Sequence, residues 1–290
     1  MRFNEAYSGK VFIGATPELN EAQSVIYGMP MDWTASFRPG SRFGPGRIRE
    51  VSLVLEEFSP YLRRDLSEIR YYDAGDIPLP FGNPEKSLDQ IGRFVAKVMA
   101  SKKMPFGLGG EHLVTWPVVR EINQYHRKLA VIHIDAHADL RTDYEGEILS
   151  HATPLRKIAQ LLGPENVYQF GIRSGTKEEF SYAEQERIHF YPFEVLKPLK
   201  EVLPQLKDRP VYVTIDIDVL DPAFAPGTGT PEPGGITSNE LFEAIHAIAR
   251  SGVHVVGADL VEVAPAYDPT EQTPVVAAKA VREMLLGFTK

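Results

Sequence analysis

Short apolar runs alternate along this chain with longer segments that carry apolar residues at helical spacing. The apolar runs predict eight strands: Ser24–Gly28, Tyr71–Asp76, Met104–Gly109, Leu129–Asp135, Val167–Gly171, Ile188–Tyr191, Val211–Asp216 and Val253–Leu260. The segments between most of them predict helices, with the clearest apolar spacing in Glu240–Ala249 and Ala277–Leu286. Strands that alternate with helices are typical of a mostly parallel sheet with helices on both faces.

Three more helices and one lead-in segment complete this outline. Pro45 suits the first turn of a helix whose apolar face holds Ile48, Val51, Leu55 and Phe58. A second helix spans Ser87–Lys102, and Gly110–His112 leads into a third that runs through Val118 and Ile122. Met1–Glu21 forms a polar lead-in. Because the chain shows no repeat and no Ser/Gly-rich linker, we expect one domain over residues 1–290. An eight-stranded barrel would use the same alternation and is the rival architecture.

The segment Leu129–Arg141 carries the clearest chemistry. Its apolar run ends in Asp135, His137 and Asp139, three ligating groups at alternate positions. Side chains two residues apart in an extended chain point the same way, so these three predict a metal pocket. A solvated strand-to-helix turn is the bland alternative. The apolar run argues against it, because such a run indicates an internal strand, and open α/β sheets bind ligands at the carboxyl ends of their strands.

Two further strand ends supply similar groups. Gly109-Gly-Glu-His112 follows one expected strand, and Asp216-Ile-Asp218 ends another. Alone, His112 would be a capping or core histidine, and the two aspartates could simply begin a turn. Pooled with the first segment, they give four carboxylates and two imidazoles, which two divalent ions that share bridging carboxylates would use in full. Hard oxygen ligands with some imidazole suit Mn²⁺, with zinc as the second choice.

The three motifs together resemble the ureohydrolases, the arginase and agmatinase family. GGEH at 109–112, DAHAD at 135–139 and DIDVLDP at 216–222 stand in the family's order. The resemblance implies a single three-layer α/β/α domain with a mostly parallel eight-stranded sheet. It also implies two Mn²⁺ per chain. One ion would be held by His112, Asp135, Asp139 and Asp216, and the other by Asp135, His137, Asp216 and Asp218.

Two further segments match the family outside the metal motifs. Ser150-His151 resembles an element whose histidine shuttles protons at the mouth of the site, and Val261–Pro265 resembles a segment whose glutamate, Glu262 here, hydrogen-bonds the substrate guanidinium. The resemblance therefore implies that Glu262 and His151 bind substrate and that Asp139 passes a proton to the leaving amine. Without it, His151 would be a surface loop histidine. Hydrolysis of the guanidinium group would yield urea and an amine.

The expected substrate is agmatine, because the arginine-type clamp is absent. Arginases contact the α-carboxylate and α-amine of their substrate through an Asn/Ser-rich loop and a later Asp. Here those places hold Leu140–Glu145 and Gly171–Gly175, while Arg38–Pro45 is typical of the agmatinase branch. The product would then be putrescine. The alternatives are guanidinobutyrate or arginine as substrate, a deacetylase-like hydrolase with one zinc, and a metal-storing protein without activity.

Composition limits the partners. The net charge of −8 argues against nucleic acid and anionic membranes and suits a small cationic guanidino substrate. Without cysteine, neither a disulfide nor a thiolate metal ligand can form. The chain shows no signal peptide and no transmembrane run, so we expect a cytoplasmic protein. The family resemblance implies a homo-oligomer, a trimer or hexamer.

Overall fold

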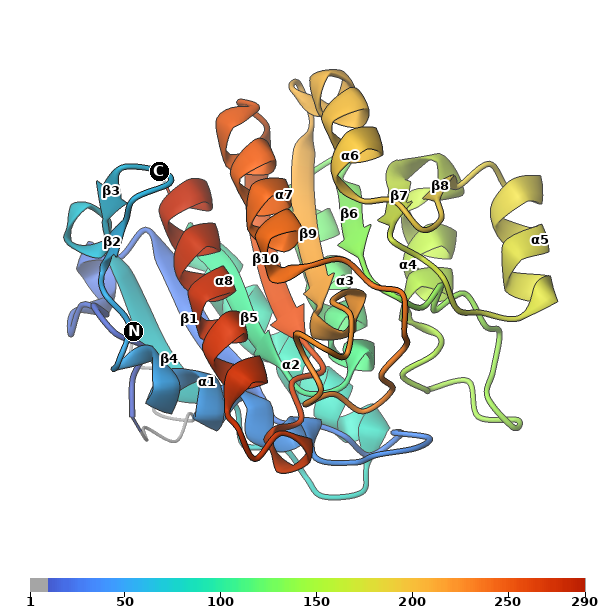
Figure 1. Ribbon diagram of the computed structural model, residues 1–290, viewed down its shortest axis with the longest axis horizontal. Coiled ribbons are helices and arrows are strands. Elements are labelled where there is room, and N and C mark those ends of the chain that lie inside the picture. Colours follow the sequence, from blue (N-terminus) through green and yellow to red (C-terminus); the bar gives the residue numbers. More distant parts are fainter. Residues whose placement is uncertain (1–9, 290) are drawn as a thin grey trace.

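Eight strands form one sheet in the computed structural model, which describes residues 10–289. In sheet order they are β4 (Tyr71–Asp76), β1 (Ser24–Met29), β5 (Met104–Gly109), β10 (His254–Val261), β9 (Pro210–Asp216), β6 (Ala130–Ile134), β7 (Val167–Phe170) and β8 (His189–Tyr191). All pairings in this sheet are parallel. The sheet is open, with β4 and β8 at its edges (Figure 1). The parallel eight-stranded sheet is therefore confirmed and the barrel alternative is wrong.

Helices cover both faces of the sheet and complete the three layers (Figure 1). One face carries α1 (Gly44–Ser52), α6 (Leu196–Val202), α7 (Ser238–Arg250) and α8 (Gln272–Phe288). The other carries α2 (Pro84–Ala100), α3 (Thr115–Tyr125) and α4 (Pro154–Leu162), and α5 (Lys177–Gln185) packs beside β8. Each face has its own apolar core, because the strands are buried on both sides.

Local sequence explains where several helices begin. The Asn83 side chain accepts a hydrogen bond of 2.9 Å from the backbone N–H of Lys86, and Pro84 occupies the first turn of α2. Thr237 and Glu240 form a reciprocal capping box at the start of α7. These residues satisfy backbone N–H groups that the helix itself leaves without partners.

The expected helix through Phe58 is too long. α1 ends at Ser52, whose hydroxyl donates to the backbone oxygen of Arg49 and accepts from the backbone N–H of Ile13. This side chain offers the backbone an alternative to further helical bonds. Phe58 instead belongs to β2 (Phe58–Ser59), which pairs with β3 (Arg64–Asp65) in a small antiparallel sheet that the apolar pattern did not predict.

The lead-in segment is only partly described. Residues 1–9 of the expected lead-in lie outside the described residues. Within the described part, Phe12 is fully buried, and its ring lies 6.5 Å from that of Tyr71. This stretch therefore contributes to the core despite its polar composition. Among residues 10–289, no helix combines the length and apolar character needed to cross a membrane.

Candidate metal centre

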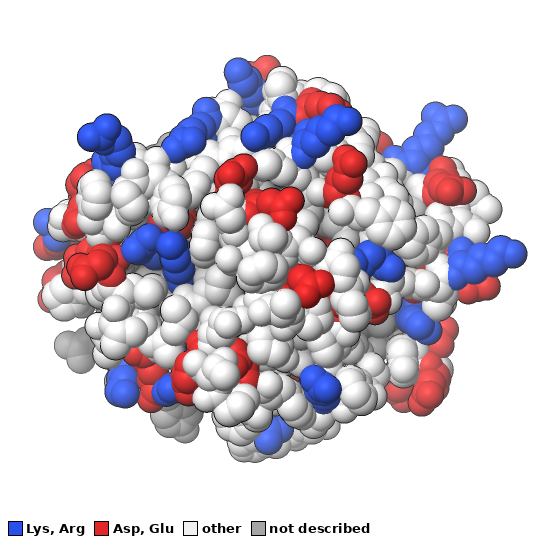
Figure 2. Space-filling model, viewed as in Figure 1, with Lys and Arg blue, Asp and Glu red and all other residues white. Residues whose placement is uncertain are grey.

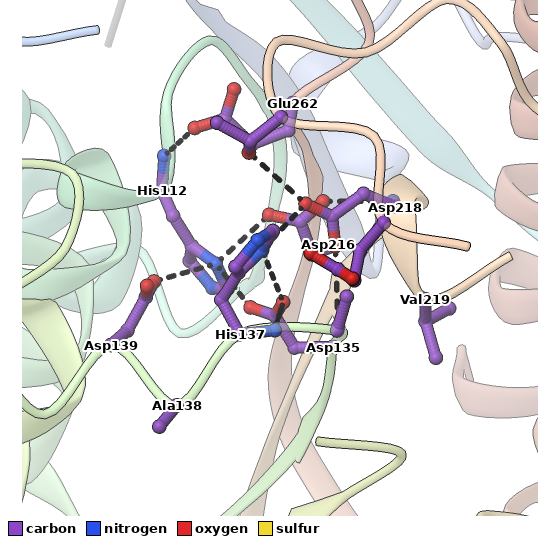
Figure 3. Close-up of polar contacts among 12 residues, drawn as sticks. His112, Asp135, His137, Ala138, Asp139, Asp216, Asp218, Val219 and Glu262 are labelled. Atoms are coloured by element: carbon purple, nitrogen blue, oxygen red, sulfur yellow. Dashed lines mark hydrogen bonds and ion pairs between the residues drawn. The ribbon is translucent and has the colours of Figure 1, made fainter. Parts of the chain in front are cut away.

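Four neighbouring strands deliver the candidate ligands to one place. β5, β10, β9 and β6 are adjacent in the sheet, and each is followed at its carboxyl end by one of the predicted site segments. Because the strands are parallel, these ends meet at the same edge of the sheet. Figure 3 shows the side chains of the six predicted metal ligands and Glu262 converging there: His112, Asp135, His137, Asp139, Asp216 and Asp218.

Three carboxylates surround one nitrogen of His112. Its Nδ1 lies 3.0 Å from Asp135 Oδ2, 3.3 Å from Asp139 Oδ2 and 3.2 Å from Asp216 Oδ2. The other ring nitrogen, Nε2, lies 2.9 Å from the hydroxyl of Thr214. The imidazole is thereby held with Nδ1 toward the carboxylates, as a metal-binding histidine requires.

A second group of ligating atoms lies beside the first. His137 Nδ1 lies 3.0 Å from Asp218 Oδ2 and 3.7 Å from Asp135 Oδ1. Backbone N–H groups fix the carboxylates, since His137 donates to Asp135 at 2.6 Å and Asp218 donates to Asp216 at 2.9 Å. Asp135 therefore belongs to both groups, which is the position expected of a bridging ligand.

Within residues 10–289, the four aspartates of this cluster lie close together without a Lys or Arg side chain to balance their charge. Burial and the neighbouring Asp218 and Asp135 raise the pKa of Asp216 well above its usual range. Burial also lowers the pKa of His112, but Asp135 and Asp139 outweigh it and raise that pKa to about 9. The described residues include no Lys or Arg ion-paired with Asp135, Asp139, Asp216 or Asp218. Within the described residues, the ion-pair partners of these acids are therefore all imidazoles.

The donor set fits divalent ions. His112 Nδ1 is buried and has no hydrogen-bond partner among the described residues, although three carboxylates lie nearby. The ligating side chains form two sets, and the ligand atoms within each set all lie within 4.8 Å of one another. One set is His112, His133, Asp135 and Asp139, and the other is Asp135, His137 and Asp218. An orphaned nitrogen that faces carboxylate oxygens is what a bound cation would satisfy.

Glu262 lies above the cluster in a strained backbone conformation. Its φ of 64° is in the left-handed region. Its Oε1 accepts a hydrogen bond of 2.8 Å from the backbone N–H of His112, as Figure 3 shows. Burial and the neighbouring Glu111 raise the pKa of Glu262 to about 8. This carboxylate therefore occupies a buried site where a cationic partner would favour its charged form.

His151 is held at the same cavity by the loop after β1. Its backbone N–H donates to the hydroxyl of Thr34 at 2.9 Å, and Thr34 is bound in turn by the carboxylate of Glu111. The ring Nε2 lies 2.9 Å from the hydroxyl of Ser36. Burial and the neighbouring His137 lower the pKa of His151 to about 4.

The candidate ligands open onto a cavity of about 270 Å³. It is lined by every candidate ligand except Asp135, together with His151, Glu262, Tyr144 and Arg141. The Nε of Arg141 lies 3.7 Å from Glu179 Oε2, and its guanidinium lies over the ring of Tyr144. Arg173 does not line the cavity, because its guanidinium donates to backbone carbonyls of Asp218, Val219, Leu220 and Glu232.

Several residues of the site were not predicted from the sequence. Thr214 and Glu111 sit beside expected ligands, but only the fold shows what they contact. His133 lies inside the apolar run of β6, where a core position was expected. Its Nε2 is 2.7 Å from Asp135 Oδ2. Its position two residues before Asp135, on the same face of the strand, was the one available signal.

Comparison with known proteins agrees with this geometry. The sequence model of the arginase family matches residues 22–287. The chain is 66% identical to the agmatinase of Bacillus subtilis (strain 168), with 100% of both chains covered. It is 37% identical to the mitochondrial guanidino acid hydrolase of Homo sapiens, over 92% of this chain and 78% of that one. The crystal structure of the agmatine ureohydrolase of Thermoplasma volcanium matches with a TM-score of 0.86 and 32% identity, over 97% of this chain and 94% of that one. The chain therefore belongs to the arginase family.

Proposed function

We propose that this protein hydrolyses agmatine to putrescine and urea at a site that holds two Mn²⁺. The observation that carries the proposal is the convergence of six ligating side chains on one place, where five of them and Glu262 line a single cavity. The full-length identity of 66% to a curated agmatinase supports agmatine as the substrate. A deacetylase-like site with one zinc would not need the second group of ligands, and a storage site would not need Glu262 and His151 at the cavity.

The site's own residues would divide the chemistry among them. When bound, two divalent ions supply a strong oxygen nucleophile near neutral pH by lowering the pKa of water. Glu262 would hold the guanidinium through charge-assisted hydrogen bonds, which are stronger than neutral ones. Asp139 would pass a proton to the leaving amine. His151, which lines the cavity beside Ser36, would relay protons between the site and solvent.

The charge of the site favours a cation. Four carboxylates and one hydroxide give −5 against +4 for two divalent ions, and Glu262 adds a further negative charge. The face shown in Figure 2 has Lys and Arg interspersed with Asp and Glu rather than gathered in a basic patch. Both features support a small cationic substrate and no nucleic-acid partner. The homo-oligomer and the cytoplasmic location stay predictions.

One observation favours a second substrate class. Arg141 lines the cavity and could meet the carboxylate of a guanidino acid such as guanidinobutyrate. Its neighbour Glu179 offsets that charge, which weighs for agmatine.

The test compares urea release from agmatine, guanidinobutyrate and arginine by the Mn²⁺-loaded protein. We expect kcat/KM for agmatine to exceed kcat/KM for guanidinobutyrate and for arginine roughly 100-fold or more. This ratio corresponds to a difference of at least a few kcal/mol in transition-state free energy. An equal or higher kcat/KM for either acid would refute the agmatine assignment. Failure to release urea from all three would refute the ureohydrolase assignment itself.

A further inference from the structure

One histidine beside the metal centre is used by none of the steps above. His133 lies on β6, is fully buried, and approaches Asp135 Oδ2 with its Nε2 at 2.7 Å. It is close enough to His112, Asp135 and Asp139 to count among the possible ligands of one ion. Its role therefore depends on which ring nitrogen carries the proton. A nitrogen that binds a metal must be unprotonated, whereas a nitrogen that donates a hydrogen bond must carry a proton.

The partner of His133 on the next strand answers this question. Gln169 of β7 is the residue paired with His133 across the sheet. Its Nε2 lies 2.7 Å from the backbone oxygen of Ala138 and 3.0 Å from His133 Nδ1. A carbonyl oxygen can only accept, so the amide must turn its NH₂ group toward Ala138. The opposite rotamer would press two carbonyl oxygens together. One hydrogen of the NH₂ group is then used by Ala138, and the second points to His133.

The orientation of the amide fixes the tautomer of the ring. Since the NH₂ group of Gln169 can only donate, His133 Nδ1 must accept and carries no proton. The proton of the neutral ring therefore sits on Nε2, which faces Asp135 Oδ2. The Oε1 of Gln169 is buried and has no hydrogen-bond partner among the described residues, so the contacts of its nitrogen alone set this arrangement.

We infer that His133 is a positioning residue that donates a hydrogen bond to Asp135, and that Gln169 holds it in the donating tautomer. One carboxylate oxygen has room for this hydrogen bond and for an ion on its other lone pair. The same amide also holds the carbonyl of Ala138, one residue before Asp139. Asp139 has a φ of 54°, in the left-handed region, so its backbone needs such support. A single buried amide thus orients two candidate ligands.

The inference rests on the proposed metal centre, but its tests do not require turnover. The first uses the full wild-type chain, freed of metal with a chelator and labelled with ¹⁵N at its eight histidines. The His133 signals are identified by their loss in His133→Phe. We expect the tautomer with the proton on Nε2. A proton on Nδ1 would overturn the inference without any variant having to fold.

The second test measures Mn²⁺ binding by equilibrium dialysis. Gln169→Glu keeps the shape of the side chain but puts an acceptor beside Nδ1. The ring must then move its proton to Nδ1 or become a cation beside the ions, and either change weakens binding. We expect the dissociation constant to rise about 10- to 100-fold, as for other residues that orient metal ligands. Gln169→Met offers neither donor nor acceptor, so its Mn²⁺ affinity should fall less than that of Gln169→Glu.

Control measurements separate this role from the alternatives. Gln205→Glu adds the same charge at an exposed position and should bind Mn²⁺ as wild type does. Thermal midpoints of the metal-free variants report whether each one folds. His133→Phe should keep two ions per chain with weaker binding. Loss of one ion from His133→Phe would make His133 a ligand and overturn the inference, as would wild-type affinity in Gln169→Glu. Failure of agmatine hydrolysis would affect neither result.

Discussion

Two clusters of acids in this protein are neutralised in opposite ways. Asp73 and Asp76, on β4, meet the guanidinium of Arg49, which is 3% exposed and lies 2.8 Å from Asp73 and 2.5 Å from Asp76. At the metal centre, the ion pairs of Asp135 and Asp216 within the described part of the chain are all with histidines. The first cluster carries its own permanent cation, whereas the second has only ionisable imidazoles.

This difference separates a structural ion pair from a site built for a ligand. A buried charge is tolerated when it is paired, and a cation supplied by the chain leaves nothing for a ligand to add. Three acids of the metal centre instead converge on the orphaned Nδ1 of His112, and two of them, Asp139 and Asp216, line a cavity. Removing a charge should therefore have opposite effects on stability in the two clusters.

The largest expected effect follows from changing a shared acid of the metal centre. In Asp216→Asn, both ions should bind more weakly, and kcat/KM should fall on the order of 10³-fold or more, because the ions supply several kcal/mol of transition-state stabilisation. In the metal-free protein, the same change should raise the thermal midpoint, because burial and the neighbouring acids disfavour ionisation of Asp216 in the folded state and an amide does not ionise. Metal analysis, urea release and calorimetry measure these effects. Fully active protein with one tightly bound ion would exclude the two-metal mechanism.

The opposite outcome is expected at the structural cluster. Arg49→Met leaves the buried Asp73 and the partly exposed Asp76 without their cation, which should lower the free energy of unfolding by about 3–5 kcal/mol. Arg47→Met is the matched control, because Arg47 is partly exposed and pairs with Glu50 and Glu271, so its loss should cost less than about 1 kcal/mol. Denaturant unfolding of both variants gives the comparison. Equal losses would mean that burial does not distinguish the two pairs.

The sequence reveals the two clusters to different degrees. The candidate ligands follow apolar runs at the ends of strands, so a local pattern was enough to predict all six and the sheet that places them. The pair of Arg49 with Asp73 joins α1 to β4, and no local pattern encodes such a contact. His133 was missed because it lies within an apolar run, and its partner Gln169 is on another strand. The end of α1 at Ser52 was missed for a similar reason, since it depends on a side-chain hydrogen bond.

A third test asks whether binding and chemistry can be separated at the metal centre. Glu262→Gln keeps the hydrogen bond that Oε1 accepts from His112 but removes the charge, so both ions should stay bound. We expect kcat/KM on agmatine to fall about 10²- to 10³-fold, the usual cost of losing one group aimed at charge in the transition state. Steady-state kinetics with metal content and thermal midpoint give the answer. Near-native kcat/KM in a folded, metal-loaded variant would mean that Glu262 does not hold the guanidinium.

The smallest effect concerns Glu283 of α8, another acid whose charge is balanced by side chains of the protein itself. It is fully buried, and its carboxylate accepts hydrogen bonds from Ser59 at 2.7 Å and from Arg282, with the ring of His246 at 2.7 Å. Burial alone would raise its pKa, but His246, Ser59 and Arg282 outweigh burial and lower the pKa from 4.5 to about 2. Because the folded-state pKa is the lower one, this stabilisation is complete above pH 4.5 and is lost as the pH falls toward 2. The size of this stabilisation is about 3 kcal/mol at most.

The test for Glu283 measures the free energy of unfolding against pH for wild type and Glu283→Gln, both in chelator so that metal binding does not contribute. The difference between the two curves should shrink as the pH falls through this window, and a constant difference would show that the charge of Glu283 does not stabilise the fold.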